Sequence, residues 1–584
     1  MNSIKNQLTL SIREFKAVLL SLKKMKTIMI LIVFLTCASL SNAQIPHLIK
    51  NEHGATQLIV HGKPFLMLAG EVHNSSGSNI QHMERIMKDL KANNLNSVLV
   101  SVSWEIIEPQ EGVFDFTSVD ELIRVARENN MKLGLLWFAS WKNGLSPYSP
   151  LWVLDNTERF IRVKDDQGNN TKTLTPLCNA TRDADARAFG ELMKHIAAVD
   201  NRENTIIVMQ IENEVGVLRQ TRDFSEEANK AFTYQVPAEL IQYMLENKNT
   251  LEIELKTAWE SNGSKTKGTW TEVFGQGDDA DLFFMAWHYC RYLNYIAEAG
   301  KKAYNIPMYV NCWMCGPRPN PGKPGDFPSG GPILSVLDIW KAGAPSVDIL
   351  SPDIYGQDFA VQAINFHRHD NPLFIPETRA TEGPASFVFA QHDAICFAPF
   401  GIDNSGSIMA QEYAMLNNMM PAITKYQGSG KMSGFYSRGQ AQAEQENNSR
   451  DIQLNDDVKI SINFSRGFRR RPAATENPNN QLGGRQQEPS WYGIFIQTGE
   501  NEFILAGENL SVTASSTNPK KIVWLKDAQE GIYDENGQWK TITLHNGDEA
   551  GFLRSDNPSY RIGGYQTNPP EPAIFSFKVV VNDK

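Results

Sequence analysis

Apolar and polar residues alternate in two ways along the first two thirds of the chain. Short β-branched and apolar runs are followed by stretches in which apolar residues recur every three or four positions. The first pattern is typical of buried strands and the second of amphipathic helices. Strands are predicted at 65–69, 97–102, 132–138, 205–210, 307–311, 347–351, 372–375 and 394–400. Helices are predicted at 80–95, 119–129, 184–199, 237–262 and 281–304.

This alternation favours a parallel sheet, because parallel neighbours need a crossover connection that is usually a helix. Eight candidate strands between residues 58 and 405 favour a (β/α)₈ barrel over an open doubly wound sheet. No Gly-x-Gly-x-x-Gly segment follows any of these strands, so the dinucleotide-binding fingerprint is absent. The predicted fold class is α/β, with a TIM barrel as the main domain.

The pattern changes after an apolar helix predicted at 406–425. Short strands joined by Gly, Asn and Asp turns then replace the helical period, which predicts a small antiparallel β-sandwich-like domain. These strands are predicted at 458–464, 492–497, 503–505, 522–525, 539–544 and 574–581. We expect residues 44–430 to form the barrel and residues 431–584 the β-domain. Long exposed loops are predicted at 437–450 and 466–489.

The N-terminal segment has the order of a secretory signal peptide. Three lysines at 23–26 precede an apolar run at 28–35, and small residues follow. We expect residues 1–43 to be removed, with Met25 as an alternative start, and the mature protein to be periplasmic or extracellular. The apolar run is too short for a stable membrane span. Lipidation at Cys37 is disfavoured, because the residue before it is large for a lipidation site.

Charge and cysteine content exclude several classes of function. The 584 residues carry a formal net charge of −10, and no basic stripe with interleaved aromatics occurs, so no nucleic-acid partner is expected. Five cysteines beyond residue 43 are too few for a disulfide framework. Cys312 and Cys315 have a metal-like spacing without a second pair, so we interpret them as thiols at a strand end and expect no zinc site.

Two glutamates follow predicted strands where a parallel barrel places its chemistry, at the carboxyl ends. Glu214 follows the fourth strand and Glu377 the seventh. Such a pair can cleave a glycoside by double displacement, because one carboxylate attacks the anomeric carbon while the other first gives and then takes a proton. Asn213 can hydrogen-bond the sugar 2-hydroxyl, a bond that tightens in the transition state. Glu212 remains an alternative to Glu214, because residues two apart on a continuing strand share a side.

Three groups of motifs occur in order over the first half of the predicted barrel. Gly70-Glu71-Val-His73 follows the first strand, a longer group runs over 95–116, and Gln210-Ile-Glu-Asn213-Glu214-Val-Gly216 follows the fourth strand. Together they resemble glycoside hydrolase family 35, which consists mostly of retaining β-galactosidases on a TIM barrel. The resemblance implies that Glu214 is the general acid/base and Glu377 the nucleophile. The chain resembles a short bacterial branch with one small C-terminal β-domain.

The chain departs from the common form of this family at two positions that help to hold galactose. Ser101 stands where most members have Tyr, and Ser140 replaces the Glu of Ala-Glu-Trp. Other side chains at strand ends are therefore candidates for holding the sugar, with packing as the alternative for each aromatic and a bracing role as the alternative for Glu71 and His73. The candidate substrate-binding residues are Asn213, Glu71, His73, Trp104, Trp141, Asn143, Trp313 and Tyr355, with Trp137 as a further possible platform.

The sequence thus predicts an exported, retaining, exo-acting β-galactosidase that hydrolyses terminal β-galactosyl residues of oligo- or polysaccharides. The expected partner is a carbohydrate substrate, and no metal or organic cofactor is expected because two carboxylates suffice. The same mechanism on a β-glucoside or an arabinopyranoside is the nearest alternative. A non-catalytic cell-surface glycan-binding protein is the other alternative, which the pair of glutamates disfavours.

Overall fold

The computed structural model describes residues 44–316, 318, 320–356, 359–437, 449–464, 491–534, 537–545, 559–562 and 572–584. The predicted signal peptide and most of the two predicted loops lie outside these ranges, and so does Cys37. Export and the boundary at residue 430 stay predictions. No helix within the described ranges is both long and apolar enough to cross a membrane.

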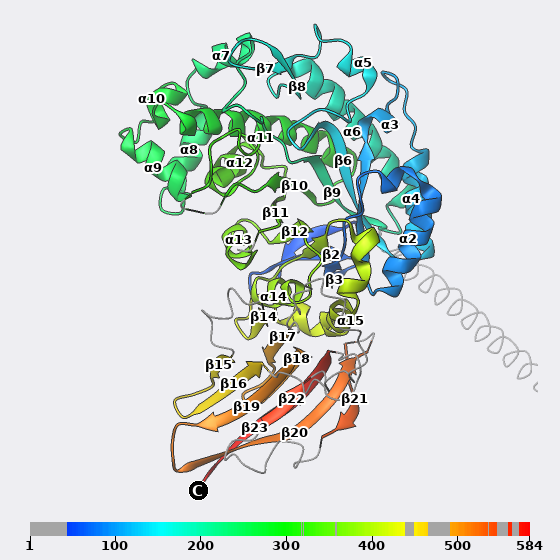
Figure 1. Ribbon diagram of the computed structural model, residues 1–584, viewed down its shortest axis with the longest axis vertical. Helices are drawn as coiled ribbons and strands as arrows, with labels where there is room; N and C mark the ends of the chain where they lie inside the picture. The colour runs from blue at the N-terminus through cyan, green and yellow to red at the C-terminus, as the bar shows by residue number, and fades with distance from the viewer. Residues whose placement is uncertain are drawn as a thin grey trace, which may run out of the picture. The chain divides into compact units, whose positions relative to one another are not determined.

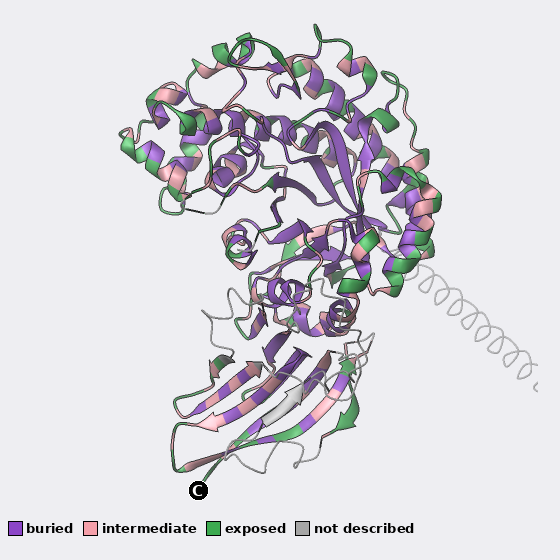
Figure 2. Ribbon diagram, in the orientation of Figure 1, coloured by how far each residue is buried: buried purple, intermediate pink, exposed green. Residues whose placement is uncertain are grey.

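Eight parallel strands form a barrel, which confirms the predicted fold class (Figure 1). Their order around the ring is β4-β13-β12-β11-β10-β9-β6-β5. Glu71 pairs with Leu99 on one side and with Phe400 on the other, which joins the two ends of the ring. The strands are β4 (Met67–Leu68), β5 (Ser97–Ser103), β6 (Lys132–Lys142), β9 (Ile206–Asn213), β10 (Met308–Trp313), β11 (Ile349–Ile354), β12 (Phe374–Thr378) and β13 (Cys396–Pro399). Almost all of their residues are buried (Figure 2).

Helices between the strands cover the barrel, as the alternation predicts. They are α2 (Ile80–Ala92), α4 (Thr117–Glu128), α6 (Asn179–Asp200), α11 (Asp278–Ala303), α12 (Leu337–Gly343), α13 (Phe359–Phe366), α14 (Pro384–Gln391) and α15 (Ile402–Tyr426). Helix α2 shows why they form. The Asn79 side chain accepts from the His82 backbone N–H and caps its start, while Met83, Ile86 and Leu90 bury one stripe.

The helical insertion predicted at 237–262 is two helices rather than one, α8 (Ala238–Glu246) and α9 (Ile253–Ser261). The segment between them contains Asn and Thr residues, which are poor helix formers. Shorter elements complete the barrel region. They are β1 (His47–Lys50), β2 (Thr56–Val60), β3 (Lys63–Phe65), η1 (Ser76–Ser78), α3 (Trp104–Ile107), α5 (Leu151–Leu154), β7 (Arg162–Lys164), β8 (Asn170–Leu174), α7 (Glu226–Phe232), α10 (Trp270–Phe274) and η2 (Leu334–Val336).

The C-terminal region contains two antiparallel sheets, in the orders β14-β17-β18-β23-β20-β21 and β15-β16-β19-β22. Apolar side chains from both sheets form one core, to which Ile460, Val512, Phe503 and Phe577 contribute. The strands are β14 (Met432–Tyr436), β15 (Ser449–Gln453), β16 (Val458–Phe464), β17 (Tyr492–Gln497), β18 (Glu502–Glu508), β19 (Leu510–Ser516), β20 (Lys521–Tyr533), β21 (Trp539–Leu544), β22 (Ser559–Ile562) and β23 (Ala573–Asp583).

Helices α14 and α15 carry a buried acid close to the C-terminal sheets. Both carboxylate oxygens of Glu412 on α15 are bonded, one to the backbone N–H of Gly383 at 2.7 Å and the other to the backbone N–H and the hydroxyl of Ser386, each at 2.7 Å. Gly434 of β14 lies against α14, where an added Cβ would come within 2.7 Å of the Phe387 backbone. Close packing and a fully bonded carboxyl group therefore hold this junction.

Candidate active site

Glu214 and Glu377 meet at the carboxyl ends of their strands. Glu214 directly follows β9, and Glu377 lies near the end of β12. One carboxylate oxygen of each lies within 4.8 Å of the other, and an oxygen of Asp353 from β11 lies within the same distance of both. All three side chains are buried. The fold thus brings together the two glutamates predicted from the sequence and adds an aspartate.

Glu212 points away from this group. Its carboxylate accepts the backbone N–H groups of Ser140 at 3.0 Å and Trp141 at 2.7 Å, and the side chain is fully buried. Glu212 and Glu214 have φ values of 58° and 47°, so the regular strand alternation ends here. The two glutamates therefore face different surroundings, and Glu212 has no access to the mouth of the barrel.

The surroundings of Glu214 favour its protonated form. Burial and the neighbouring Glu377 raise the pKa of Glu214 to about 7, although Lys142 and a bond with Asp353 act in the opposite direction. Burial beside Glu377 and Glu214 also raises the pKa of Asp353 well above its usual range. A carboxyl group that titrates near neutral pH can give a proton and take it back, which suits a general acid/base.

Glu377 receives hydrogen bonds on both oxygens. The Tyr355 hydroxyl donates to Oε2 at 2.8 Å, and the Asn213 amide donates to Oε1 at 3.4 Å. Burial and the nearby Glu377 raise the pKa of Tyr355, so its hydroxyl remains a donor at neutral pH. Donors on both oxygens hold Glu377 in one orientation and stabilise a negative charge on it.

Glu71 lies at the same mouth, and its carboxyl group makes no hydrogen bond to any described residue. Its side chain is 1% exposed, and neither carboxylate oxygen has a hydrogen-bond partner among the described residues. Burial and Glu377 raise the pKa of Glu71 well above its usual range, while Lys142 lowers it. Buried polar groups are nearly always hydrogen-bonded, so an unpartnered carboxyl group here is available to a ligand hydroxyl.

Trp104 and Trp141 are not sugar platforms. Both are fully buried, and their indole N–H groups donate to Glu108 and to the Leu174 carbonyl. The expectation that they bind substrate is wrong, because each ring packs inside the barrel wall with its polar atom already bonded. Trp137 is buried in the same way.

The remaining predicted residues lie closer to solvent. Trp313, at the end of β10, is 41% exposed and is paired in register with Asp353. Tyr355, two residues beyond Asp353, is 38% exposed. His73 has an exposed ring whose Nδ1 lies 2.7 Å from Asp403. The backbone N–H of Asn143 donates to the Asn213 carbonyl, and its side-chain oxygen is buried without a partner among the described residues.

Three residues at this site were not singled out from the sequence. Lys142 ends β6, and its Nζ donates to Asn213 Oδ1 at 2.7 Å. Asp353 is the penultimate residue of β11. Asn311 on β10 donates to it at 2.8 Å and accepts the Glu214 backbone N–H at 3.1 Å. A polar residue at or next to a strand end was the available signal for Lys142 and Asp353, and a polar residue inside an apolar strand was the signal for Asn311.

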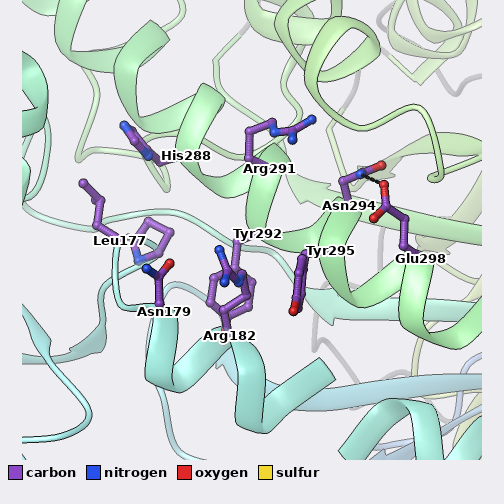
Figure 3. A pocket seen from close by; sticks show the side chains of 10 residues that line it. Leu177, Asn179, Arg182, His288, Arg291, Tyr292, Asn294, Tyr295 and Glu298 are labelled. Carbon is purple, nitrogen blue, oxygen red and sulfur yellow. Dashed lines mark hydrogen bonds between the residues drawn. The ribbon is translucent and has the colours of Figure 1, made fainter. Parts of the chain in front are cut away.

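A cavity of about 240 Å³ lies elsewhere, between α6 and α11 (Figure 3). Its lining includes Arg182, His288, Arg291 and Tyr295 and none of the carboxyl groups at the mouth. Arg182 is already paired with Asp183 and stacked on the Tyr295 ring. We therefore place the chemistry at the mouth of the barrel.

Two family models match separate parts of this chain. Residues 74–276 match the family model Glyco_hydro_42, described as "Beta-galactosidase". Residues 409–555 match a second family model, described as "Domain of unknown function (DUF5597)". The first match includes Asn213 and Glu214 but ends before Glu377. Family 35, which the motifs resemble, is not confirmed by this match.

Individual relatives agree with this result over short stretches. A β-galactosidase of Xanthomonas manihotis is 27% identical over 168 residues, which cover 28% of this chain and 25% of that protein. Arabidopsis thaliana β-galactosidase 11 is 27% identical over 176 residues, 29% of this chain and 19% of that protein. The chain thus spans a quarter or less of the length of these two relatives.

Among solved structures, the β-galactosidase from Bacillus circulans sp. alkalophilus matches with a TM-score of 0.41 and 16% sequence identity. The matched region covers 61% of this chain and 56% of that β-galactosidase chain. The match to the β-galactosidase family model agrees with the predicted enzyme class. The matched residues lie in the barrel region, which gathers its buried carboxyl groups at the strand ends.

Proposed function

We propose that this protein hydrolyses terminal β-galactosides with retention of configuration, using Glu377 as nucleophile and Glu214 as general acid/base. The observation that carries the proposal is the pair of buried carboxyl groups whose oxygens lie within 4.8 Å of each other. Retaining enzymes hold their two carboxyl groups about 5–5.5 Å apart, whereas inverting enzymes need about 6.5–9.5 Å to admit a water molecule.

The hydrogen bonds support this division of roles. Glu377 has donors on both oxygens, which orient it for attack on the anomeric carbon. Glu214, with its raised pKa, gives its proton to the leaving oxygen as the bond between that oxygen and the anomeric carbon breaks. In the second step Glu214 takes a proton from water, the resulting hydroxyl group bonds to the anomeric carbon, and the bond to Glu377 breaks.

Galactose and exo action are proposed from the "Beta-galactosidase" family model and the β-galactosidase relatives. A β-glucoside or an arabinopyranoside is the second candidate, because two expected galactose contacts are absent. The Ser101 hydroxyl donates to the Asn74 carbonyl, and the Ser140 hydroxyl donates to Asp185, so both are engaged within the protein.

The test is hydrolysis of aryl β-galactoside, glucoside, arabinopyranoside and fucoside, with the anomer of the first-formed sugar determined by NMR. We expect the galactoside to be cleaved fastest and to release the β-anomer first. Preference for another sugar would keep the mechanism and change the substrate. Initial release of the α-anomer would refute retention, and binding of glycans without turnover of any substrate would favour the glycan-binding alternative.

A further inference from the structure

A bulge in β6 shapes one side of the mouth. Trp137 is paired with Ile211 and Lys142 with Asn213, so residues 138–141 of β6 stand opposite the single residue Glu212 of β9. Such a bulge redirects the end of a strand and re-aims its side chains. Here it brings Lys142 level with Asn213.

Glu212 fills the space that the bulge creates. Its carboxylate accepts three successive backbone N–H groups, from Ala139 at 3.3 Å, Ser140 at 3.0 Å and Trp141 at 2.7 Å. Asp185 supports the same segment from α6, because it accepts the Ser140 hydroxyl at 2.6 Å and the Trp137 indole N–H at 2.9 Å. The bulge is thus held by buried acids and offers a firm base for Lys142.

Lys142 determines which way the Asn213 amide faces. Its Nζ lies 2.7 Å from Asn213 Oδ1, and the side chain is buried above the Phe138 ring. An ammonium group only donates hydrogen bonds, so the amide oxygen must face it. The amide NH₂ is then directed to the other side, where Glu377 Oε1 lies 3.4 Å away.

From this geometry we propose that Lys142 is a positioning residue for the reaction. It holds the Asn213 amide with its NH₂ toward the nucleophile and the 2-hydroxyl of the bound sugar. This inference rests on the proposed function and deepens it, because it names the substrate hydroxyl through which Lys142 acts. Bonds to the 2-hydroxyl strengthen as the glycosidic bond breaks, so a misdirected amide lowers the rate more than substrate binding.

The experiment compares two aryl glycosides of the preferred sugar, one with the 2-hydroxyl and one 2-deoxy. The enzymes are wild type, Lys142→Met, Asn213→Ala and the double variant. We expect Lys142→Met to lower kcat/KM for the 2-hydroxy substrate by about 10- to 100-fold, mainly through kcat. For the 2-deoxy substrate we expect Lys142→Met to change kcat/KM by less than about 3-fold. We expect an equally small change between Asn213→Ala and the double variant on the 2-hydroxy substrate, because the amide that Lys142 holds is already absent.

Lys132→Met is the matched control. Lys132 begins the same strand at the opposite end of the barrel, where it donates to the Asn204 carbonyl. We expect it to leave kcat/KM unchanged on both substrates. If Lys142→Met does not fold, Lys142→Leu is measured in its place, since it also removes the ammonium group and offers no donor to the Asn213 amide oxygen.

Two results would overturn the inference. One is that Lys142→Met lowers kcat/KM equally for the 2-hydroxy and 2-deoxy substrates. The other is that the loss of kcat/KM in the double variant equals the product of the losses in Lys142→Met and Asn213→Ala. Either leaves the proposed function standing, because wild type still turns over its substrate and Glu377→Gln still abolishes turnover. A wild-type enzyme inert toward every glycoside would instead overturn both.

Discussion

Two of the regions that bury carboxyl groups treat them in opposite ways. At the junction of α14 and α15, the Glu412 carboxylate accepts two backbone N–H groups and one hydroxyl. At the mouth of the barrel, Glu71 has no partner among the described residues, and Glu214 lies against Glu377. A bonded buried acid stabilises the fold around it, whereas crowded acids cost stability and are retained where chemistry needs them.

The comparison also shows that a shifted pKa does not by itself identify a catalytic group. Burial is the largest cause that raises the pKa of Glu412 to about 7, and the same is true of Glu214. The two differ in their partners. Glu214 faces a second carboxyl group at a strand end, while Glu412 faces donors inside the protein. The following changes test whether one set of acids serves catalysis and the other serves stability.

The largest effect is expected for Glu377→Gln. An amide cannot form the covalent intermediate, so turnover of every substrate should fall by at least about 10⁴-fold. The unfolding temperature should stay the same or rise, because the substitution removes one of several charges that repel each other. Steady-state assays and calorimetry measure the two quantities. Substantial remaining turnover would exclude Glu377 as the nucleophile.

Glu214→Ala should give a smaller and selective loss. Substrates with poor leaving groups should lose about 10²- to 10⁴-fold, because their leaving oxygen needs a proton. Activated aryl glycosides should still form the intermediate, and added azide should then restore its breakdown. Glu212→Ala is the comparison variant. If it abolishes turnover of folded enzyme while Glu214→Ala behaves like wild type, the acid/base assignment is wrong.

The same assignment predicts the pH profile. Glu214 must carry its proton for the first step, so kcat/KM for poor leaving groups should fall as pH rises through about 7. In Glu214→Ala with activated substrates this basic limb should disappear. A basic limb unchanged by the substitution would assign it to another group.

Glu412→Ala should affect stability and spare catalysis. The change leaves the Gly383 and Ser386 N–H groups buried without an acceptor, which costs about 3 kcal/mol or more. Per folded molecule, kcat/KM should remain within about twofold of wild type. Ser386→Ala, which removes one of the three donors, should cost about 1 kcal/mol. Denaturant titration gives both free energies of unfolding. Unchanged stability in Glu412→Ala would show that the bonded carboxyl group does not stabilise the junction of α14 and α15.

The sequence predicted the barrel well, because each of its strands is a short apolar run between amphipathic helices. Among the strands that the structure describes in the C-terminal region, four were missed, and β14 and β19 show why; the other two are β15 and β22. Strand β14 contains Gly434, and β19 is rich in Ser and Thr, so neither forms a continuous apolar run. Local pattern alone does not distinguish such strands from turns.

The site was predicted in part for a related reason. Glu214 and Glu377 could be found because a strand end is visible in the sequence. Lys142 could not be assigned a partner, since the bulge that brings it to Asn213 depends on the buried Glu212 carboxylate. Trp104 was misplaced because the sequence does not show whether a residue at a strand end turns into the wall.

The smallest effect is expected for Glu71→Gln, and it depends on pH. The pKa of Glu71 is raised in the folded protein, so the folded state binds this proton more tightly than the unfolded state does. Its contribution to stability is therefore present at low pH and is lost as pH rises from the unfolded pKa through the folded one. Gln carries no charge at any pH and escapes that loss. The free energy of unfolding of Glu71→Gln minus that of wild type should thus rise with pH, by about 1 kcal/mol or more between pH 5 and 8. The pKa of Glu412 is raised as well, so the difference for Glu412→Gln should also rise with pH. It should start from a lower value at every pH, because an amide NH₂ cannot accept a backbone N–H group in place of a carboxyl oxygen. If the difference for Glu71→Gln stays flat or falls with pH, the negative charge on Glu71 is compensated in the folded protein. The carboxyl group of Glu71 would then not destabilise the mouth of the barrel.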